Sequence, residues 1–179
     1  MTRAQLEHLI RAAADLAEDE DIVVVGSQAI LGQFPDAPAT LRVSVEADLY
    51  PRHRPERADL IDGTIGEGSP FHETYGYYAQ GVGEETAVLP AGWQDRLVAV
   101  RSEGTRGATG WCLEAHDLVI AKAVAGRERD RVFVREAIRH RLVDQATLGE
   151  RLVTTGVAPG VADRLRAWFA ADFALPRAG

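Results

Sequence analysis

Two carboxylates in the N-terminal half of the chain have the spacing to hold a metal ion. Glu46 and Asp48 are separated by one residue within residues 42–50, where apolar and polar side chains alternate strictly. Such alternation is typical of a half-buried β-strand, on which alternate side chains lie on one face about 6–7 Å apart. Two carboxylates at that distance can share Mg²⁺, which takes carboxylate oxygens together with substrate phosphates. The alternative is that both acids only form the solvated face of an antiparallel strand.

A glycine and a serine that precede these acids could bind the phosphates themselves. Gly26 and Ser27 follow residues 22–25, a β-branched run that predicts a short buried strand, and residues 28–31 are predicted as a short helix that Ser27 caps. Backbone N–H groups at a helix start attract anions, glycine allows close approach, and serine adds a hydroxyl donor. The turn and the acids together could form a site for a metal-bound triphosphate, where the metal would lower the pKa of an attacking hydroxyl.

Lys122 is the only lysine of the chain, and it lies among apolar residues of a predicted helix. A compact positive charge in that setting suits a phosphate. The alternative is a lysine whose stem packs while its ammonium group reaches water or pairs with Asp117 or Asp130. In one continuous helix Lys122 and Asp130 would lie about 12 Å apart, so they could flank a ligand but not bond directly, unless Gly126 ends the helix.

The elements that must position these residues form a mixed region followed by a helical region. Strands are predicted over residues 22–25, 42–50, 71–82, 96–102 and 111–113, and helices over residues 2–20, 28–31, 54–65, 114–125, 128–140, 145–155 and 160–173. This order predicts an α/β (α+β) fold with a small mixed β-sheet and a helical C-terminal region. We expect two domains, residues 1–113 and residues 114–179.

Composition excludes several classes of protein. The 179 residues carry a formal net charge of −7, which argues against a broad nucleic-acid-binding surface. One cysteine, Cys112, allows neither an internal disulfide nor a cysteine-rich zinc site, and the five histidines lack metal-ligand spacing. No apolar run approaches the roughly 20 residues of a membrane span, and the start lacks the apolar stretch of a secretory signal. We therefore expect a cytoplasmic protein that does not enter a membrane.

The turn and the acidic strand together resemble the nucleotidyltransferase superfamily of the polymerase-beta type. Members carry a Gly-Ser turn that opens a helix, and then a strand that reads Ser or Thr, any residue, Asp, any residue, Asp and an apolar residue. Here Gly26 and Ser27 form the turn, and residues 44–49 read Ser-Val-Glu-Ala-Asp-Leu. The resemblance implies a nucleotidyltransferase-type sheet, nucleotide binding by Gly26 and Ser27, and Mg²⁺ binding and catalysis by Glu46 and Asp48.

Residues 117–130 resemble the segment that follows the sheet in abortive-infection type nucleotidyltransferase toxins and their uncharacterised relatives. Those proteins show an Asp-Leu pair, a lysine on the same helix, and then an arginine and an Arg-Asp pair, as this chain does. The resemblance implies that Lys122 and Arg127 bind nucleotide and that Asp130 serves catalysis. It also implies Mg²⁺-dependent transfer of a nucleotidyl group from an NTP to an RNA, protein or small-molecule acceptor, in a toxin–antitoxin pair with a cognate antitoxin as partner.

The superfamily usually places a third acidic residue on the strand that follows the acidic one. The position that aligns here is Gln80, which is neutral, and Glu84, Glu85 or Asp95 could replace it. The alternative function is therefore a degenerate, non-catalytic module that binds a nucleotide or a partner protein.

Overall fold

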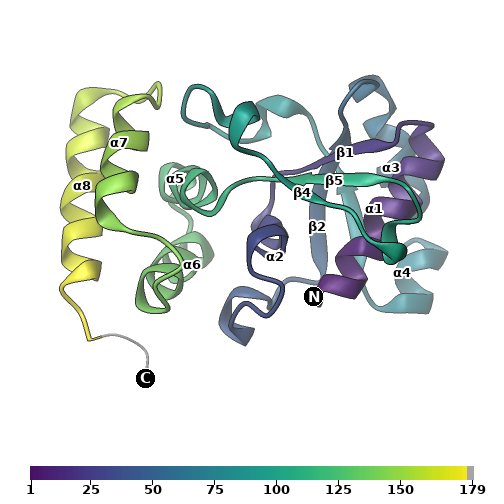
Figure 1. Ribbon diagram of the computed structural model, residues 1–179, viewed down its shortest axis with the longest axis horizontal. Coiled ribbons are helices and arrows are strands. Elements are labelled where there is room, and N and C mark those ends of the chain that lie inside the picture. The colour runs from purple at the N-terminus through teal and green to yellow at the C-terminus, as the bar shows by residue number, and fades with distance from the viewer. Residues whose placement is uncertain (177–179) are drawn as a thin grey trace. The chain divides into compact units, whose positions relative to one another are not determined.

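The computed structural model describes residues 1–176 and divides the chain into two compact units, each described separately below (Figure 1). The first unit comprises Met1–Thr86 and Leu97–Glu114. The second comprises Ala87–Arg96 and the chain from Ala115 onward. Residues 87–96 lie within the predicted first domain but group with the helical part, so the chain passes between the two units three times.

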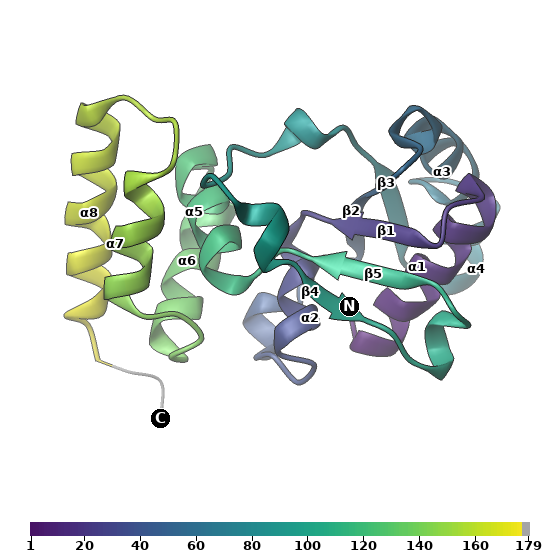
Figure 2. The same ribbon diagram turned by 45° about the horizontal axis from the view of Figure 1, so that its top comes forward.

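The first unit contains a five-stranded mixed sheet (Figure 2). Its strands are β1 (Asp21–Val24), β2 (Glu46–Pro51), β3 (Tyr78–Gly81), β4 (Val98–Val100) and β5 (Thr109–Cys112), in the order β3-β2-β1-β5-β4. Strand β1 pairs antiparallel with β2 and parallel with β5, whereas β2 and β3 are parallel and β4 and β5 are antiparallel. The mixed sheet and the accompanying helices confirm the predicted α+β fold class.

Two helices pack on the same face of β5. Helix α1 (Arg3–Ala17) approaches Gly110 so closely that a Cβ there would lie 2.3 Å from the Cδ1 atom of Ile10. Helix α2 (Ile30–Gln33) approaches Cys112, whose Cβ would lie 2.5 Å from a Cβ at Gly32. Because Gly110 and Cys112 are two residues apart on one strand, they face the same side. Helices α1 and α2 therefore cover one face of the sheet at this strand.

The strand register places the two acids of β2 on the opposite face. Cys112 pairs with Val24, and Val24 pairs with Leu49, so these three side chains share the helix-covered face. All three are fully buried. Glu46 and Asp48 alternate with the buried residues of β2, so they face away from α1 and α2 and are half-buried.

Three predicted strands are shorter in the structure than the sequence pattern indicated, and one of them is the strand predicted over residues 96–102, which is reduced to β4. Strand β2 begins only at Glu46, and in the preceding residues 42–45 the side chain of Val43 is 79% exposed. The strand predicted over residues 71–82 divides into α4 (Pro70–Tyr75) and β3, because Ser69 caps a helical turn and Gly76, at a φ of 73°, ends it. The helix predicted over residues 54–65 is confirmed as a 3-10 turn followed by α3 (Ala58–Ile65).

The second unit contains the four predicted C-terminal helices. They are α5 (Ala115–Ala125), α6 (Glu128–Arg139), α7 (Gln145–Val153) and α8 (Pro159–Phe173), each within two residues of its predicted range. Asp144 caps α7 by accepting a hydrogen bond from the N–H of Thr147. Within residues 1–176, no helix is long and apolar enough to cross a membrane.

A buried carboxylate holds residues 87–96 to these helices. Asp117 of α5 is fully buried and accepts hydrogen bonds from Nε and Nη2 of Arg96, at 2.8 and 3.1 Å. Arg151 of α7 places its Nε 3.3 Å from the same carboxylate. The Ala91 N–H donates to the Thr154 carbonyl at 3.0 Å. One carboxylate therefore joins α5, α7 and the inserted segment within the second unit.

Asp117→Ala is expected to lower the free energy of unfolding by about 3–5 kcal/mol, because it leaves two largely buried guanidinium groups without their counter-ion. Urea unfolding followed by circular dichroism measures the loss. Asp163→Ala is the matched control, since Asp163 pairs with Arg166 on the surface with its side chain 75% exposed, and it should cost less than about 1 kcal/mol. Equal losses for the two variants would contradict the role given to Asp117.

Candidate functional site

The turn after β1 meets the acidic strand at Gly26. Strands β1 and β2 remain paired up to this point, since the Val25 N–H donates to the Asp48 carbonyl at 3.0 Å. The Asp48 side chain lies directly against the glycine, so that a Cβ at position 26 would be 1.7 Å from Asp48 Oδ2. Only a residue without a side chain leaves room for the carboxylate there. The structure thus brings Gly26 and Asp48 into contact.

Ser27 does not cap a helix, which corrects the sequence prediction. A 3-10 helix covers Ser27–Ala29, with Gly26 in the extended cap position and no side-chain cap bond. The helix therefore starts one residue earlier than predicted, and α2 behind it has only four residues. The Ser27 hydroxyl instead accepts a long hydrogen bond, 3.4 Å, from Nε2 of Gln28.

Glu46 is held by a tyrosine from the neighbouring strand. Glu46 and Tyr78 are register partners of the parallel strands β2 and β3, and the Tyr78 hydroxyl donates to Glu46 Oε2 at 3.1 Å. Burial, with the negative charge of Glu46 and this hydrogen bond, raises the pKa of Tyr78 to about 12. The phenol therefore stays protonated near neutral pH and remains a donor to the carboxylate.

Gln80 lies directly opposite Asp48 in the parallel pairing of β2 and β3. The aligned third acidic position is thus next to the acids but is occupied by an exposed, neutral side chain. Among the acids that could replace it, Glu84 influences Tyr50: burial, reinforced by the negative charge of Glu84, raises the pKa of the Tyr50 hydroxyl to about 12. Tyr50 follows Asp48 by two residues on the same strand, so it shares the face of the acids.

Lys122 and Asp130 form an ion pair within the second unit. Lys122 Nζ lies 3.2 Å from Asp130 Oδ1, with the lysine side chain 18% exposed and the aspartate 2%. The contact exists because α5 ends at Gly126, whose φ is 66°, and α6 begins two residues later. Lys122 and Asp130 are therefore not separated by the roughly 12 Å that one continuous helix would impose. Of the pairings considered for Lys122, the one with Asp130 is present, while Asp117 binds arginines.

The other oxygen of Asp130 lacks a hydrogen bond. Asp130 Oδ2 is buried and takes no hydrogen bond from any residue that the structure describes, and Arg127 Nε lies 4.0 Å from it. Arg127 itself is largely exposed. A buried carboxylate oxygen without a donor is costly, so this atom is a position where a ligand or water would be bound favourably.

The predicted functional residues thus form two groups, one in each unit. The first group is the turn and the acids of β2: Gly26, Ser27, Glu46 and Asp48. The second is the end of α5 and the start of α6: Lys122, Arg127 and Asp130. Within each group the side chains lie on neighbouring elements, although they are up to 22 residues apart in sequence.

A further cluster compatible with a metal ion was missed by the sequence analysis. Asp19, Asp21 and His53 each offer a ligand atom, and these atoms lie within 4.8 Å of one another. The Asp21 carboxylate also accepts a hydrogen bond from Trp111 Nε1 at 2.6 Å. Asp21 begins β1 while Gly26 follows its end, roughly 16 Å away along the strand. The antiparallel β1–β2 pairing creates this cluster, because it brings His53, the second residue after β2, beside the start of β1.

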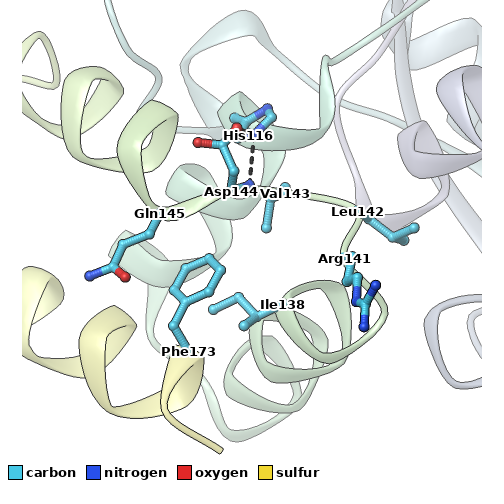
Figure 3. A pocket seen from close by; sticks show the side chains of 8 residues that line it. All are labelled: His116, Ile138, Arg141, Leu142, Val143, Asp144, Gln145 and Phe173. Carbon is cyan, nitrogen blue, oxygen red and sulfur yellow. Dashed lines mark hydrogen bonds and ion pairs between the residues drawn. The ribbon is translucent and has the colours of Figure 1, made fainter. Parts of the chain in front are cut away.

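The second unit also has an open cavity of about 490 Å³, shown in Figure 3. Its lining residues are His116, Ile138, Arg141, Leu142, Val143, Asp144, Gln145 and Phe173. His116 Nε2 lies 3.2 Å from Asp144 Oδ2 at its edge. None of the predicted functional residues lines this cavity.

Gly26→Ala is expected to displace the Asp48 carboxylate and to lower the free energy of unfolding by about 1–3 kcal/mol, because the new methyl group overlaps Oδ2. Gly63→Ala is the control: Gly63 lies within α3 with nothing near its Cβ position, so alanine should stabilise the helix by about 0.5–1 kcal/mol. Thermal unfolding compares the two variants. A Gly26→Ala protein as stable as the wild type would contradict the close contact.

One family model matches the chain. It carries the description "Nucleotidyltransferase of unknown function (DUF6036)" and matches residues 4–167, which include every residue of the two groups. No curated protein and no solved structure matches the chain. Because the family model covers most of the sequence, the chain belongs to this nucleotidyltransferase family.

Proposed function

We propose that the protein is a Mg²⁺-dependent nucleotidyltransferase that moves a nucleotidyl group from an NTP to a hydroxyl of an RNA, a protein or a small molecule. The observation that carries the proposal is the contact of the Asp48 carboxylate with Gly26, beside Ser27 and on the same strand face as Glu46. The family membership of the chain supports the same activity.

Glu46 and Asp48 are suited to hold the metal ion. Both offer only oxygen atoms, the ligands that Mg²⁺ prefers, and both are half-buried on a face not covered by α1 and α2. A Mg²⁺ ion held by these two carboxylates would bind the triphosphate and lower the pKa of the attacking hydroxyl. Tyr78 keeps the Glu46 carboxylate oriented by donating to Oε2.

The remaining residues bind and position the substrate in this proposal. The Ser27 hydroxyl donates to a phosphate oxygen, and the cations Lys122 and Arg127 offset phosphate charge. Asp130 orients Lys122 or accepts the proton of the acceptor hydroxyl. That hydroxyl oxygen bonds to the α-phosphorus, the bond from phosphorus to the α,β-bridging oxygen breaks, and pyrophosphate leaves.

The alternative function is a module that binds nucleotide without transferring it. The neutral Gln80 opposite Asp48 favours this alternative, because it leaves the strand pair one acid short of the superfamily pattern. Calorimetric titration with each NTP and Mg²⁺ measures binding, and incubation with an α-labelled NTP, total RNA and the protein itself measures transfer. Metal-dependent binding without any transfer would favour the module over the enzyme.

Asp48→Asn is expected to reduce transfer of the label by about 100-fold or more, because it removes a charge that holds the metal ion. Asp59→Asn is the control, since Asp59 is an exposed residue of α3 and belongs to neither group of predicted functional residues. If Asp48→Asn transfers label as fast as the control, Asp48 is not part of the catalytic site.

Lys122→Ala is expected to weaken NTP binding about 10-fold and also to destabilise the protein by about 3 kcal/mol, since it leaves the buried Asp130 without its partner. The double variant Lys122→Leu with Asp130→Leu separates the two effects, because an apolar pair restores stability but not phosphate binding. Calorimetry and urea unfolding measure both quantities. NTP affinity that recovers together with stability would exclude Lys122 from nucleotide binding.

The most specific part of the proposal is that the protein acts as a toxin. It rests on the resemblance of residues 117–130 to abortive-infection type toxins, with a cognate antitoxin as the partner. Induced expression in a bacterial host provides the measurement. Growth arrest that disappears with Asp48→Asn would support a toxin, whereas unchanged growth at full expression would contradict it.

A further inference from the structure

Gln28 is a buried amide beside the glycine-serine turn. Its side chain is fully buried within the 3-10 helix Ser27–Ala29. Its Oε1 takes no hydrogen bond from any residue between positions 1 and 176. Burying an amide oxygen without a donor destabilises a protein by about 1–3 kcal/mol, and an apolar side chain of the same shape would avoid that cost. The amide therefore needs an explanation other than stability.

The only hydrogen bond found for this side chain in the described residues goes to Ser27. Gln28 Nε2 donates to Ser27 Oγ at 3.4 Å, a distance too long for much stabilisation. A serine hydroxyl has one proton to donate and two lone pairs to accept with. When the Gln28 amide donates to a lone pair, the serine proton has to point elsewhere. The bond thus favours one direction of the hydroxyl proton and does not hold the hydroxyl in position.

We propose that Gln28 is a positioning residue that turns the Ser27 hydroxyl toward donating to a phosphate oxygen of the substrate. The inference rests on the proposed function and adds a residue that the sequence pattern of the superfamily does not include. Without Gln28 the hydroxyl rotates freely and can donate to a backbone carbonyl instead. With Gln28 the donor is set before the anionic substrate arrives, which lowers the entropy lost on binding.

A double-mutant cycle tests the inference. The four proteins are the wild type, Ser27→Ala, Gln28→Met and the double variant, titrated by calorimetry with Mg²⁺ and the NTP that the wild type binds most tightly. Gln28→Met keeps the length of the side chain and removes its hydrogen bonds. We expect it to weaken NTP binding about 3- to 10-fold in the wild type and less than about 2-fold in the Ser27→Ala background.

Thermal stability separates positioning from a structural role. Gln28→Met should melt at the same temperature as the wild type or higher, because it removes the unpaired amide. Gln33→Met is the control on α2: Gln33 is exposed, and its exchange should leave NTP affinity unchanged.

Three results would overturn the inference. Equal loss of affinity from Gln28→Met in both backgrounds, together with a lower melting temperature, would show a structural residue. Wild-type affinity in Gln28→Met would show that the amide is not used, while leaving the proposed function standing. No binding of any NTP by the wild type would overturn both proposals.

Discussion

The arrangement of the candidate site in the first unit depends on how closely the Asp48 carboxylate approaches the backbone at Gly26. The antiparallel pairing of β1 and β2 continues to Val25, so the turn that follows is held at the level of the acids. A side chain at position 26 would occupy the place of the carboxylate. Ser27 lies at the start of a 3-10 helix rather than at its cap, so its hydroxyl makes no helix-capping hydrogen bond.

Buried ion pairs play the corresponding part in the second unit. Asp117 forms ion pairs with two arginines, and Asp130 forms one with Lys122 of the preceding helix. Such pairs are weak contributors to stability when compared with apolar packing, yet each fixes the relative positions of the elements that it joins because a lone buried charge is so unfavourable. The lysine ammonium is therefore held in place beside Asp130, in the last turn of α5.

Local sequence patterns predicted the elements but not their pairing. The four C-terminal helices follow from their apolar periodicity, and the strand with Glu46 and Asp48 follows from its alternation, although Val43 and its neighbours continue that alternation outside the sheet. The Asp19–Asp21–His53 cluster had no local signal, because it arises from the pairing of strands far apart in sequence. Gly126 was the residue that decided the Lys122–Asp130 contact, and its effect depends on a backbone angle that composition alone leaves open.

The insertion of residues 87–96 into the helical unit has a consequence for how such proteins can be rearranged in evolution. The helical unit is encoded in two separate pieces, and Arg96 from the first piece neutralises Asp117 from the second. A gene fusion or deletion with a single breakpoint near residue 114 would separate this arginine from its carboxylate. The two units are therefore expected to be inherited together, and to exchange with foreign domains only through paired breakpoints.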